Sequence, residues 1–354
     1  EDVKDNRICD LISQRILREF RKPIDLNGHE IFMTISMGIL YCSDKQLEHA
    51  DAIRMADISM LQAKKKGRNT VVYFHEIEDK EIEKRLLLEN QLQKAIHQEQ
   101  IFVQYQPLMN LTDNQLYGVE ALVRWNHPEL GTVLPGSFIP IAEENGLIIP
   151  LGRKVFETAF NDFAHWLSMC PQAGRLFLAI NLSAKQMLQD DLVESIRKAA
   201  FDAKLPLENL KLEITESVFI DDVDHVAEVI NDLRELGVTI SIDDFGTGYC
   251  SLKYLNHFSI DLVKIDKSLI HNITTNETNF NIVSSVMQLC ERLKLNVVAE
   301  GIENIDQLET LKEMNCKLGQ GYYFFPPQGK KAMEKLIYEI MVPDSRSIKK
   351  SNSA

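Results

Sequence analysis

Acidic and amide side chains follow several short apolar runs of this sequence, each at the point where the run ends. The runs are Val119 to Glu120, Phe177 to Asn181, Leu210 to Glu213, Val238 to Asp244, Leu262 to Asp266 and Val297 to Glu300. The strands of a parallel α/β barrel end on one rim, so groups that are distant in sequence can meet there. Carboxylate and amide oxygens suit Mg²⁺ or Mn²⁺ better than zinc, which favours His and Cys. The pattern therefore predicts a carboxylate-rich metal site.

The acidic pair Asp243 and Asp244 is the sharpest local signal. The first ends an apolar strand, and the second opens the turn DDFGTGY, whose glycines permit tight backbone curvature. An acidic pair at such a junction can bridge two cations. The alternative is that each acid of the pattern caps the following helix, since Asp and Glu stabilise helix N-termini. Repetition at successive strand ends, with Lys264 among the acids, favours a functional site.

Charge and cysteine usage limit the partners and the environment. A net charge of -13 argues against a duplex nucleic-acid partner, because such binding depends on Lys and Arg at phosphates. An acidic pocket could hold a phosphate ester only with the help of cations. The six cysteines show no CxxC pair and no zinc spacing, so we expect reduced thiols in a cytoplasmic protein. We also expect no membrane span and no signal peptide, because no apolar stretch approaches ~20 residues.

Alternating strands and helices must position these side chains. From Ile101 onward the expected strands are QYQPLM, LYGVEALVRW, LFLAINLS, LKLEITES, VTISIDDFGTG, LVKIDKS, LNVVAEGIE and QGYYFF. Helical intervals separate all but the first pair, which the turn at 112–114 joins, so this pair is expected to be antiparallel. Eight strands with alternating helices predict a TIM-like (β/α)8 barrel over residues 85–340.

A shorter α/β segment precedes the predicted barrel. Residues 1–75 show the order helix, strand, helix, strand, which is too little for a complete α/β domain. A charged linker, residues 76–84, leads into an amphipathic helix that opens the barrel unit. The polar residues 341–354 are expected to form a frayed tail.

Two motifs of residues 1–75 suggest a family for this segment. They are TISMGI and IRMADISMLQAKKKGRNTVVYF, and they resemble the C-terminal half of a GGDEF (diguanylate cyclase type) domain, which commonly reads SIGIA…ADxALYxAKxxGRN. Ser59, Met60 and Leu61 depart from the usual ALY. The signature Gly-Gly-Asp/Glu-Glu-Phe hairpin is missing, so we expect no cyclase activity from this partial segment.

The motif EALVRW at 120–125 resembles the signature of the EAL family of cyclic-di-GMP phosphodiesterases. The motifs that accompany it in order are YQP (105–107), PGSFIPIAEENGLI (135–148), NLS (181–183), EITES (213–217), DDFGTGY (243–249), KID (264–266), AEGIE (299–303) and QGYYF (320–324). This ordered set spans residues 85 to 330 approximately and is far more specific than any single motif. By resemblance, the chain is identified as a member of this family.

The resemblance implies a role for each candidate residue. Two Mg²⁺ or Mn²⁺ ions are expected per site, with the ligands Glu120, Asn181, Glu213, Asp243, Asp244 and Glu300. Lys264 would position or activate the attacking water, with Glu300 also catalytic, and Glu216 would tether the loop after Asp244. Substrate contacts are expected from Gln106, Arg124, Asp266, Glu303 and Gln320. Three alternatives stay open, since Glu216 and Glu303 could face solvent and Arg124 could form a surface salt bridge.

The Lys264 ammonium should stay protonated among the carboxylates, because opposite charges favour the charged form. We therefore expect it to orient and stabilise charge rather than to act as a free base. Two cations ~3.5 to 4 Å apart can generate hydroxide and stabilise charge on phosphorus. The resemblance thus implies metal-dependent hydrolysis of cyclic-di-GMP to linear pGpG.

Other functions fit parts of the sequence. An EAL fold can act as a cyclic-di-GMP receptor without cutting, although such receptors typically lack some ligands, and this chain lacks none that we identify. A barrel enzyme for another phosphate ester would leave the ordered motifs unexplained. EAL proteins are often dimers, so a homodimer through the barrel helices is a further expectation. Two departures from the family pattern are Cys250, which replaces a usual Ser, and Phe325-Pro326-Pro327, which replaces small or basic residues.

Overall fold

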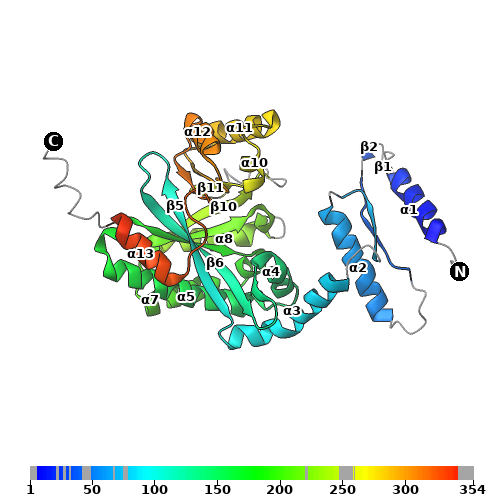
Figure 1. The fold of residues 1–354 in the computed structure, drawn as a ribbon, viewed down its shortest axis with the longest axis horizontal. Helices are drawn as coiled ribbons and strands as arrows, with labels where there is room; N and C mark the ends of the chain where they lie inside the picture. The colour runs from blue at the N-terminus through cyan, green and yellow to red at the C-terminus, as the bar shows by residue number, and fades with distance from the viewer. Residues whose placement is uncertain are drawn as a thin grey trace. The chain divides into compact units, whose positions relative to one another are not determined.

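The computed structural model divides the chain into two compact units, Glu1–Leu87 and Leu88–Ala354 (Figure 1). The loop at 247–251, including Cys250, and the tail from 342 onward lie outside the residues that the structure describes. Those residues are 6–20, 24–26, 29–31, 33–41, 49–66, 68–74, 79–219, 222–246, 258 and 260–341.

The first unit has the predicted order of helix, strand, helix and strand, with one additional hairpin. Its elements are α1 (Asn6–Phe20), β1 (Ile24–Leu26), β2 (His29–Ile31), β3 (Met37–Ile39), α2 (His49–Lys65) and β4 (Val71–Tyr73). Strands β1 and β2 form the antiparallel hairpin. Strands β3 and β4 are parallel, and α2 connects them in the chain. Among the described residues of this unit, the buried apolar ones are Leu17, Ala63 and Val72, and Ile58 and Phe74 pack against the last two.

The second unit contains a closed barrel, as predicted. Its eight described strands follow one another around the barrel in the order β5 (Ile101–Asn110), β13 (Leu318–Gly319), β12 (Asn296–Ala299), β11 (Leu262–Ile265), β10 (Thr239–Phe245), β9 (Leu210–Thr215), β8 (Phe177–Leu182) and β6 (Leu116–His127). The pairing of β6 with β5 closes the ring. Strand β5 runs antiparallel to both of its neighbours, whereas the other pairs of the ring are parallel. The expected TIM-like barrel with an antiparallel first pair is therefore confirmed.

Helices surround the barrel, and most of them lie between successive strands in the chain (Figure 1). A short strand, β7 (Gly131–Val133), extends β6 by antiparallel pairing. The helices are α3 (Asp79–His97), α4 (Pro135–Glu144), α5 (Ile148–Met169), α6 (Ala184–Met187), α7 (Leu192–Ala203), α8 (Val223–Glu235), α10 (Lys267–His271), α11 (Glu277–Leu293), α12 (Ile305–Glu313) and α13 (Lys330–Met341), with the 3₁₀ turns η2 (Pro171–Arg175), η3 (Leu207–Asn209) and η4 (Glu216–Phe219).

The interior of the barrel is apolar at one end and polar at the other. Side chains two positions apart on a strand share a face, so Leu262 lies on the same side of β11 as Lys264. The buried residues of the apolar layer are Leu108, Phe177, Ala179, Leu262, Val298 and Leu318. They fill the amino end of the parallel strands, and the polar candidates of the sequence occupy the carboxyl end. A larger core lies between the outer faces of the strands and the helices.

The last predicted strand, QGYYFF, is wrong in its position. Strand β13 comprises only Leu318–Gly319, and residues 320–325 form turns. The N–H of Phe325 donates to the carbonyl of Gly321, which closes one of these turns. A Cβ on Gly321 would lie 2.0 Å from the carbonyl oxygen of Ile302, so glycine allows a backbone approach that a strand residue would block. The aromatic run resembled a strand because β propensity alone does not register this contact.

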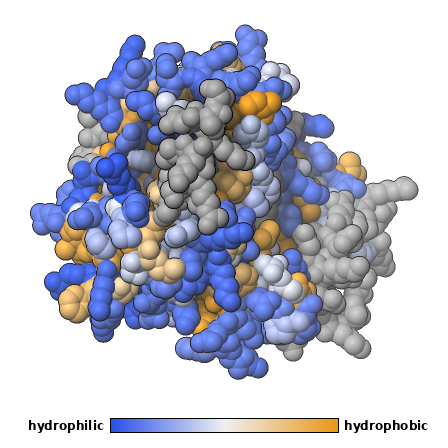
Figure 2. All heavy atoms as spheres, turned by 60° about the vertical axis from the view of Figure 1, so that its left-hand side comes forward, coloured by the Kyte–Doolittle hydropathy of each residue, from blue (hydrophilic) through white to orange (hydrophobic). Residues whose placement is uncertain are grey.

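The outer surface of the barrel is mostly polar on the face that Figure 2 shows. Hydrophilic residues cover most of the coloured surface, and hydrophobic residues form small separate groups. Within the described parts of the chain, no helix is long and apolar enough to cross a membrane.

Candidate active site

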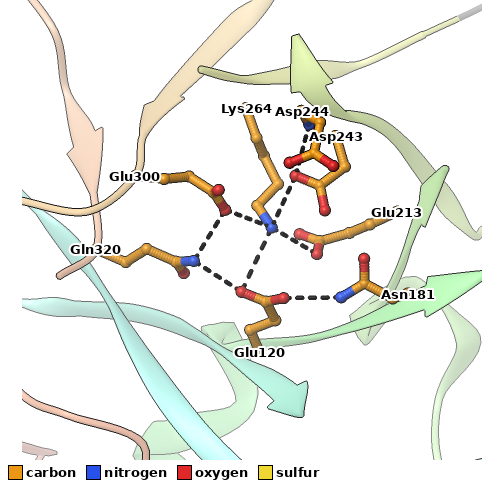
Figure 3. Close-up of polar contacts among 8 residues, drawn as sticks. All are labelled: Glu120, Asn181, Glu213, Asp243, Asp244, Lys264, Glu300 and Gln320. Atoms are coloured by element: carbon orange, nitrogen blue, oxygen red, sulfur yellow. Dashed lines mark hydrogen bonds and ion pairs between the residues drawn. The ribbon is translucent and has the colours of Figure 1, made fainter. Parts of the chain in front are cut away.

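Lys264 lies at the centre of the polar end of the barrel, where Figure 3 shows carboxylates converging on its ammonium. It extends from β11 and is only 1% exposed. Its Nζ is 2.7 Å from both Glu213 Oε2 and Glu300 Oε1. The same atom is 3.3 Å from Asp243 Oδ1 and 3.4 Å from Glu120 Oε2. Acidic side chains that the sequence analysis predicted to converge from separate strand ends therefore do meet, around the ammonium of Lys264.

The lysine and the acids control one another's charge. Burial opposes the ammonium, but the surrounding carboxylates raise the pKa of Lys264 well above its usual value. The lysine is therefore charged, as expected from the sequence. Burial raises the pKa of Glu213 well above its usual range and that of Glu300 to about 8. Since one ammonium balances one of four carboxylates, the cluster favours further cations or bound protons.

Two amide side chains orient the acids of the cluster. Burial raises the pKa of Glu120, but Lys264 and hydrogen bonds from Gln320 and Asn181 outweigh burial and lower it overall. Asn181 Nδ2 donates to Glu120 Oε1 at 2.8 Å. Gln320 Nε2 donates both to Glu120 Oε2 at 2.7 Å and to Glu300 Oε1 at 3.0 Å. Gln320 thus bridges two acids that the sequence separates by 180 residues, and Asn181 fixes the rotation of one of them (Figure 3).

A left-handed residue brings the two neighbouring aspartates together. In a regular strand, consecutive side chains point to opposite faces, which would separate Asp243 from Asp244. Asp244 instead has φ 53°, and the pairing of β10 with β11 shifts register between Ile242 and Phe245. Asp is one of the few residues that tolerates this backbone region. Its own N–H donates to Asp243 Oδ1 at 3.0 Å. Both carboxylates consequently reach the same site.

Asp243, Asp244 and Glu300 fit a divalent cation. Each offers one carboxylate oxygen, and these atoms all lie within 4.8 Å of one another. Burial, together with the nearby acids Asp243 and Asp266, raises the pKa of Asp244 to about 6. A set of oxygen donors that repel one another matches hard cations such as Mg²⁺ or Mn²⁺.

Glu216 makes a direct contact to the turn after Asp244. The N–H of Gly246 donates to Glu216 Oε1 at 3.3 Å. Gly246 has φ 97°, a conformation that glycine adopts readily. This contact is the one that a tether requires. Of the expected loop from Asp244 to Ser251, the structure describes residues 244–246. Glu216 is therefore not simply a solvent-facing acid at the start of η4.

Two of the expected substrate-contacting residues lie on β5 and β6, the strands whose pairing closes the barrel. Gln106 pairs across the two strands with Glu120, and its Nε2 donates to the carbonyl of Phe325 at 3.3 Å. Arg124 is 7% exposed, and its Nε donates to Gln104 Oε1 at 2.9 Å. Arg124 is buried, and among the described residues its hydrogen-bond partners are neutral oxygens, so these contacts do not support the alternative of a surface salt bridge.

Asp266 and Glu303 differ in their relation to the cluster. Asp266 accepts a hydrogen bond from the N–H of Ser268 at 2.9 Å, so it caps α10, and it also lies beside Asp244. The helix-cap alternative therefore holds for this acid without removing it from the site. Glu303 is exposed, and its Oε2 lies 3.6 Å from His271 Nδ1. The described contacts thus do not bring Glu303 into the cluster.

Two features of the site were not predicted from the sequence. One is the positive φ of Asp244, and the other is the backbone carbonyl of Phe325 beside Gln106. Every residue has a backbone carbonyl, so residue type does not indicate which carbonyl lies at a site. The positive φ has a weak signal, because Asp is enriched among non-glycine residues with this conformation.

The sequence matches two families. Residues 89–327 match the family described as EAL domain, and residues 2–70 match the family described as diguanylate cyclase, GGDEF domain. The first match covers the barrel strands and every candidate side chain of the site.

Individual relatives agree with these matches. Cyclic di-GMP phosphodiesterase NbdA of Pseudomonas aeruginosa is 35% identical over 339 residues, which are 95% of this chain and 43% of that protein. Bifunctional diguanylate cyclase/cyclic di-GMP phosphodiesterase MucR of the same organism is 35% identical over 317 residues, 89% of this chain and 46% of that protein. The chain therefore spans less than half the length of these relatives.

A solved structure resembles the barrel closely. The PaMucR phosphodiesterase in its c-di-GMP complex is 36% identical and superimposes with a TM-score of 0.67. The match covers 70% of this chain and 99% of that structure. The similarity therefore extends over the whole of a phosphodiesterase domain.

Proposed function

This chain belongs to the EAL domain family, and from that premise we propose that it hydrolyses cyclic-di-GMP to linear pGpG. The observation that carries the proposal is the cluster of four carboxylates around Lys264 at the carboxyl end of the barrel (Figure 3). That end holds the active site in TIM-barrel enzymes. The similarity to a phosphodiesterase with bound c-di-GMP supports the choice of substrate.

We propose that the site binds two divalent cations, Mg²⁺ or Mn²⁺. When bound, such ions supply a more acidic water and stabilise negative charge on phosphorus. The oxygen donors support this choice, as does the excess of negative charge that Lys264 leaves unbalanced. The ligands would be Glu120, Asn181, Glu213, Asp243, Asp244 and Glu300.

The remaining side chains bind, orient and neutralise. Lys264 keeps its proton, so it stabilises developing negative charge and orients the attacking water rather than removing a proton from it. The oxygen of water forms a new bond to phosphorus while the bond from phosphorus to one ribose oxygen breaks, so the ring opens. One proton of the water ends on the departing ribose oxygen, which becomes a hydroxyl group. Arg124 would contact a phosphate of the dinucleotide, and Gln106 would contact a base. Gln320 holds Glu300 in position, and Glu216 holds the turn after Asp244.

The rest of the chain is assigned by the same reasoning. We propose a partial GGDEF-like segment over residues 1–75, a linker over 76–84, the phosphodiesterase barrel over 85–340 and a polar tail over 341–354. Because the cyclase hairpin is missing from the segment, it should not convert GTP. The scattered cysteines support a cytoplasmic setting, and the family relationship supports a homodimer through the barrel.

The decisive experiment uses the purified chain, cyclic-di-GMP and Mg²⁺ or Mn²⁺, with chromatographic separation of the products. We expect pGpG to form, chelation to stop its formation and Ca²⁺ to inhibit, because calcium tolerates irregular coordination. Activity that survives exhaustive chelation would contradict the proposed metal chemistry. The alternative function is a receptor, and unchanged dinucleotide with micromolar binding would favour it.

A further inference from the structure

A buried hydrogen-bond network lies on the outer side of strand β5, behind the substrate-side residue Gln106. Tyr105 precedes Gln106, and consecutive strand side chains point to opposite faces, so Tyr105 points outward when Gln106 points inward. Tyr105 is fully buried, and its ring lies edge-on to Trp166 with the ring centroids 4.7 Å apart. Its hydroxyl donates to Asp162 Oδ2 at 2.7 Å. The position of the strand at Gln106 is therefore fixed from outside the barrel.

A lysine from the C-terminal helix completes this network. Asp162 of α5 is 8% exposed, and a carboxylate at such a depth needs partners for both oxygens. Tyr105 occupies Oδ2, and Lys330 Nζ lies 2.6 Å from Oδ1. Lys330 is the first residue of α13, which packs against both β5 and α5 (Figure 1). One buried carboxylate thus joins a barrel strand to two helices.

The segment that precedes α13 also contacts β5, through backbone hydrogen bonds to Tyr105 and a hydrogen bond from the side chain of Gln106. The N–H of Tyr105 donates to the carbonyl of Gln328, and the N–H of Gln328 donates to the carbonyl of Tyr105, each at 2.7 Å. Three residues earlier, the carbonyl of Phe325 accepts from Gln106 Nε2. Pro326 and Pro327 lie between these contacts, and proline restricts the backbone to a narrow φ range. A stiff segment therefore links the outer network to the inner amide.

We propose that Asp162, Lys330 and the Tyr105 hydroxyl form a clamp that positions Gln106 and the Phe325 carbonyl for the dinucleotide. The inference deepens the proposed function and rests on it. None of the three clamp residues touches the Lys264 cluster in the described contacts, so the clamp acts on substrate binding and not on the chemical step. Residues of this kind are positioning residues, and their loss should change KM while kcat remains.

The test compares four variants of the full chain by initial rates with cyclic-di-GMP, after thermal melting shows that each is folded. Tyr105→Phe removes the hydroxyl alone, and Lys330→Met removes the ammonium from a position that is 48% exposed. We expect KM to rise about 10-fold in both, with kcat changed by less than about two-fold. Lys330→Arg keeps the charge and should restore most of the affinity.

Glu334→Gln is the matched control. Glu334 Oε2 lies 3.6 Å from His165 Nε2, so this pair also joins α13 to α5 but has no contact to Tyr105. Its KM should equal that of the unmodified chain. An equal rise of KM in Glu334→Gln would show that docking of α13 in general, and not the clamp, is responsible, which overturns the inference.

Two further outcomes also overturn it. In one, Tyr105→Phe and Lys330→Met lower the melting temperature and leave KM unchanged, so the network is only structural. In the other, kcat falls at constant KM, so the network acts on chemistry. If the unmodified chain neither binds nor cleaves cyclic-di-GMP, the proposed function fails first and this inference fails with it. Measurements on the unmodified chain alone reveal that failure, so it is distinguished from a failure of the clamp.

Discussion

The two ends of the barrel interior each hold a lysine, in opposite surroundings. Lys264 at the carboxyl end lies among four carboxylates, and they raise its pKa well above the usual value. Lys211 lies on β9 two positions before Glu213, toward the amino end. Its Nζ is 3.7 Å from the ring centroid of Phe177 and 5.0 Å from that of Tyr117. Burial there lowers the pKa of Lys211 to about 8. The same side chain is thus a strong cation at one end and a destabilised one at the other.

The difference between the two lysines shows that the proposed active site and the stabilising apolar packing occupy opposite ends of the barrel interior. At the carboxyl end, like charges lie close together, which destabilises the cation-free protein but suits the proposed site for cations and phosphate. At the amino end, apolar residues such as Leu262 and Val298 fill the interior, and Lys211 is held by aromatic rings. Substitutions at the first end should therefore alter turnover, and substitutions at the second should alter stability.

The largest effect is expected from removing an acid at the carboxyl end. Glu120→Ala or Asp243→Ala deletes a proposed metal ligand, so turnover should fall by more than the ~10² to 10³-fold that loss of one preorganised donor causes. Lys211→Met, at the other end, is the control and should keep its turnover. Initial rates at saturating Mg²⁺ test the contrast. Near-normal turnover with an ordinary metal requirement would remove these acids from the site.

Removing the central cation should have the next largest effect. Lys264→Met should lower kcat by ~10² to 10³-fold, because a positioned charge that stabilises the transition state is lost. It should also destabilise the protein in the absence of divalent ions by about 3 to 5 kcal/mol, since buried carboxylates lose their partner. Chemical denaturation with and without Mg²⁺ measures this. Equal stability of the variant and the parent without metal would contradict the cluster's dependence on Lys264.

Of the two ends, only the carboxyl end of the barrel was predictable from the sequence. Apolar runs that end in Glu120, Asn181 or Asp243 indicate strands with polar ends, and the barrel rule then brings those ends together. The charge of Lys264 was also predictable, because neighbouring carboxylates favour the protonated form of a lysine. Nothing comparable marked Lys211, because a lysine at the start of a strand usually faces solvent, and its aromatic neighbours come from strands β6 and β8.

The remaining misses have a common physical cause. The aromatic run at 320–325 favours a strand by propensity, but close backbone contact between Gly321 and Ile302 makes it turn. The clamp on Tyr105 depends on Asp162 and Lys330, which are separated by 168 residues in a sequence where neither belongs to a motif. Contacts between distant elements decide both features, and local patterns carry no information about them.

Glu216 should show a smaller effect than the acids it supports. Its contact to the N–H of Gly246 holds the turn after Asp244. Glu216→Ala should therefore lower turnover by ~10 to 100-fold with little change in dinucleotide affinity, and Glu216→Gln should lie between this variant and the parent. Turnover, affinity and melting temperature are measured together. Unchanged turnover with a lower melting temperature would mean that Glu216 only stabilises the start of η4.

The smallest effect is expected at the amino end, in the pH dependence of stability. The folded pKa of Lys211 is about 8, below the ordinary value of 10.5. Between these values the unfolded chain binds more protons than the folded chain, so this group makes stability rise as pH rises through the interval. A shift of this size corresponds to about 3 kcal/mol at most. Because contacts with two aromatic rings favour the ammonium by ~0.5 to 2 kcal/mol, we expect a rise of about 1 to 2 kcal/mol.

Lys211→Met isolates this contribution from the other groups that titrate in the same interval. It keeps a long apolar side chain against Phe177 and Tyr117 but has no proton to release. The free energy of unfolding in urea is measured for both proteins from pH 7 to pH 10.5, and the parent is expected to gain on the variant as pH rises. A difference that stays constant over this range would mean that the rings hold the ammonium fully charged. The two lysines would then differ in their partners but not in their charge.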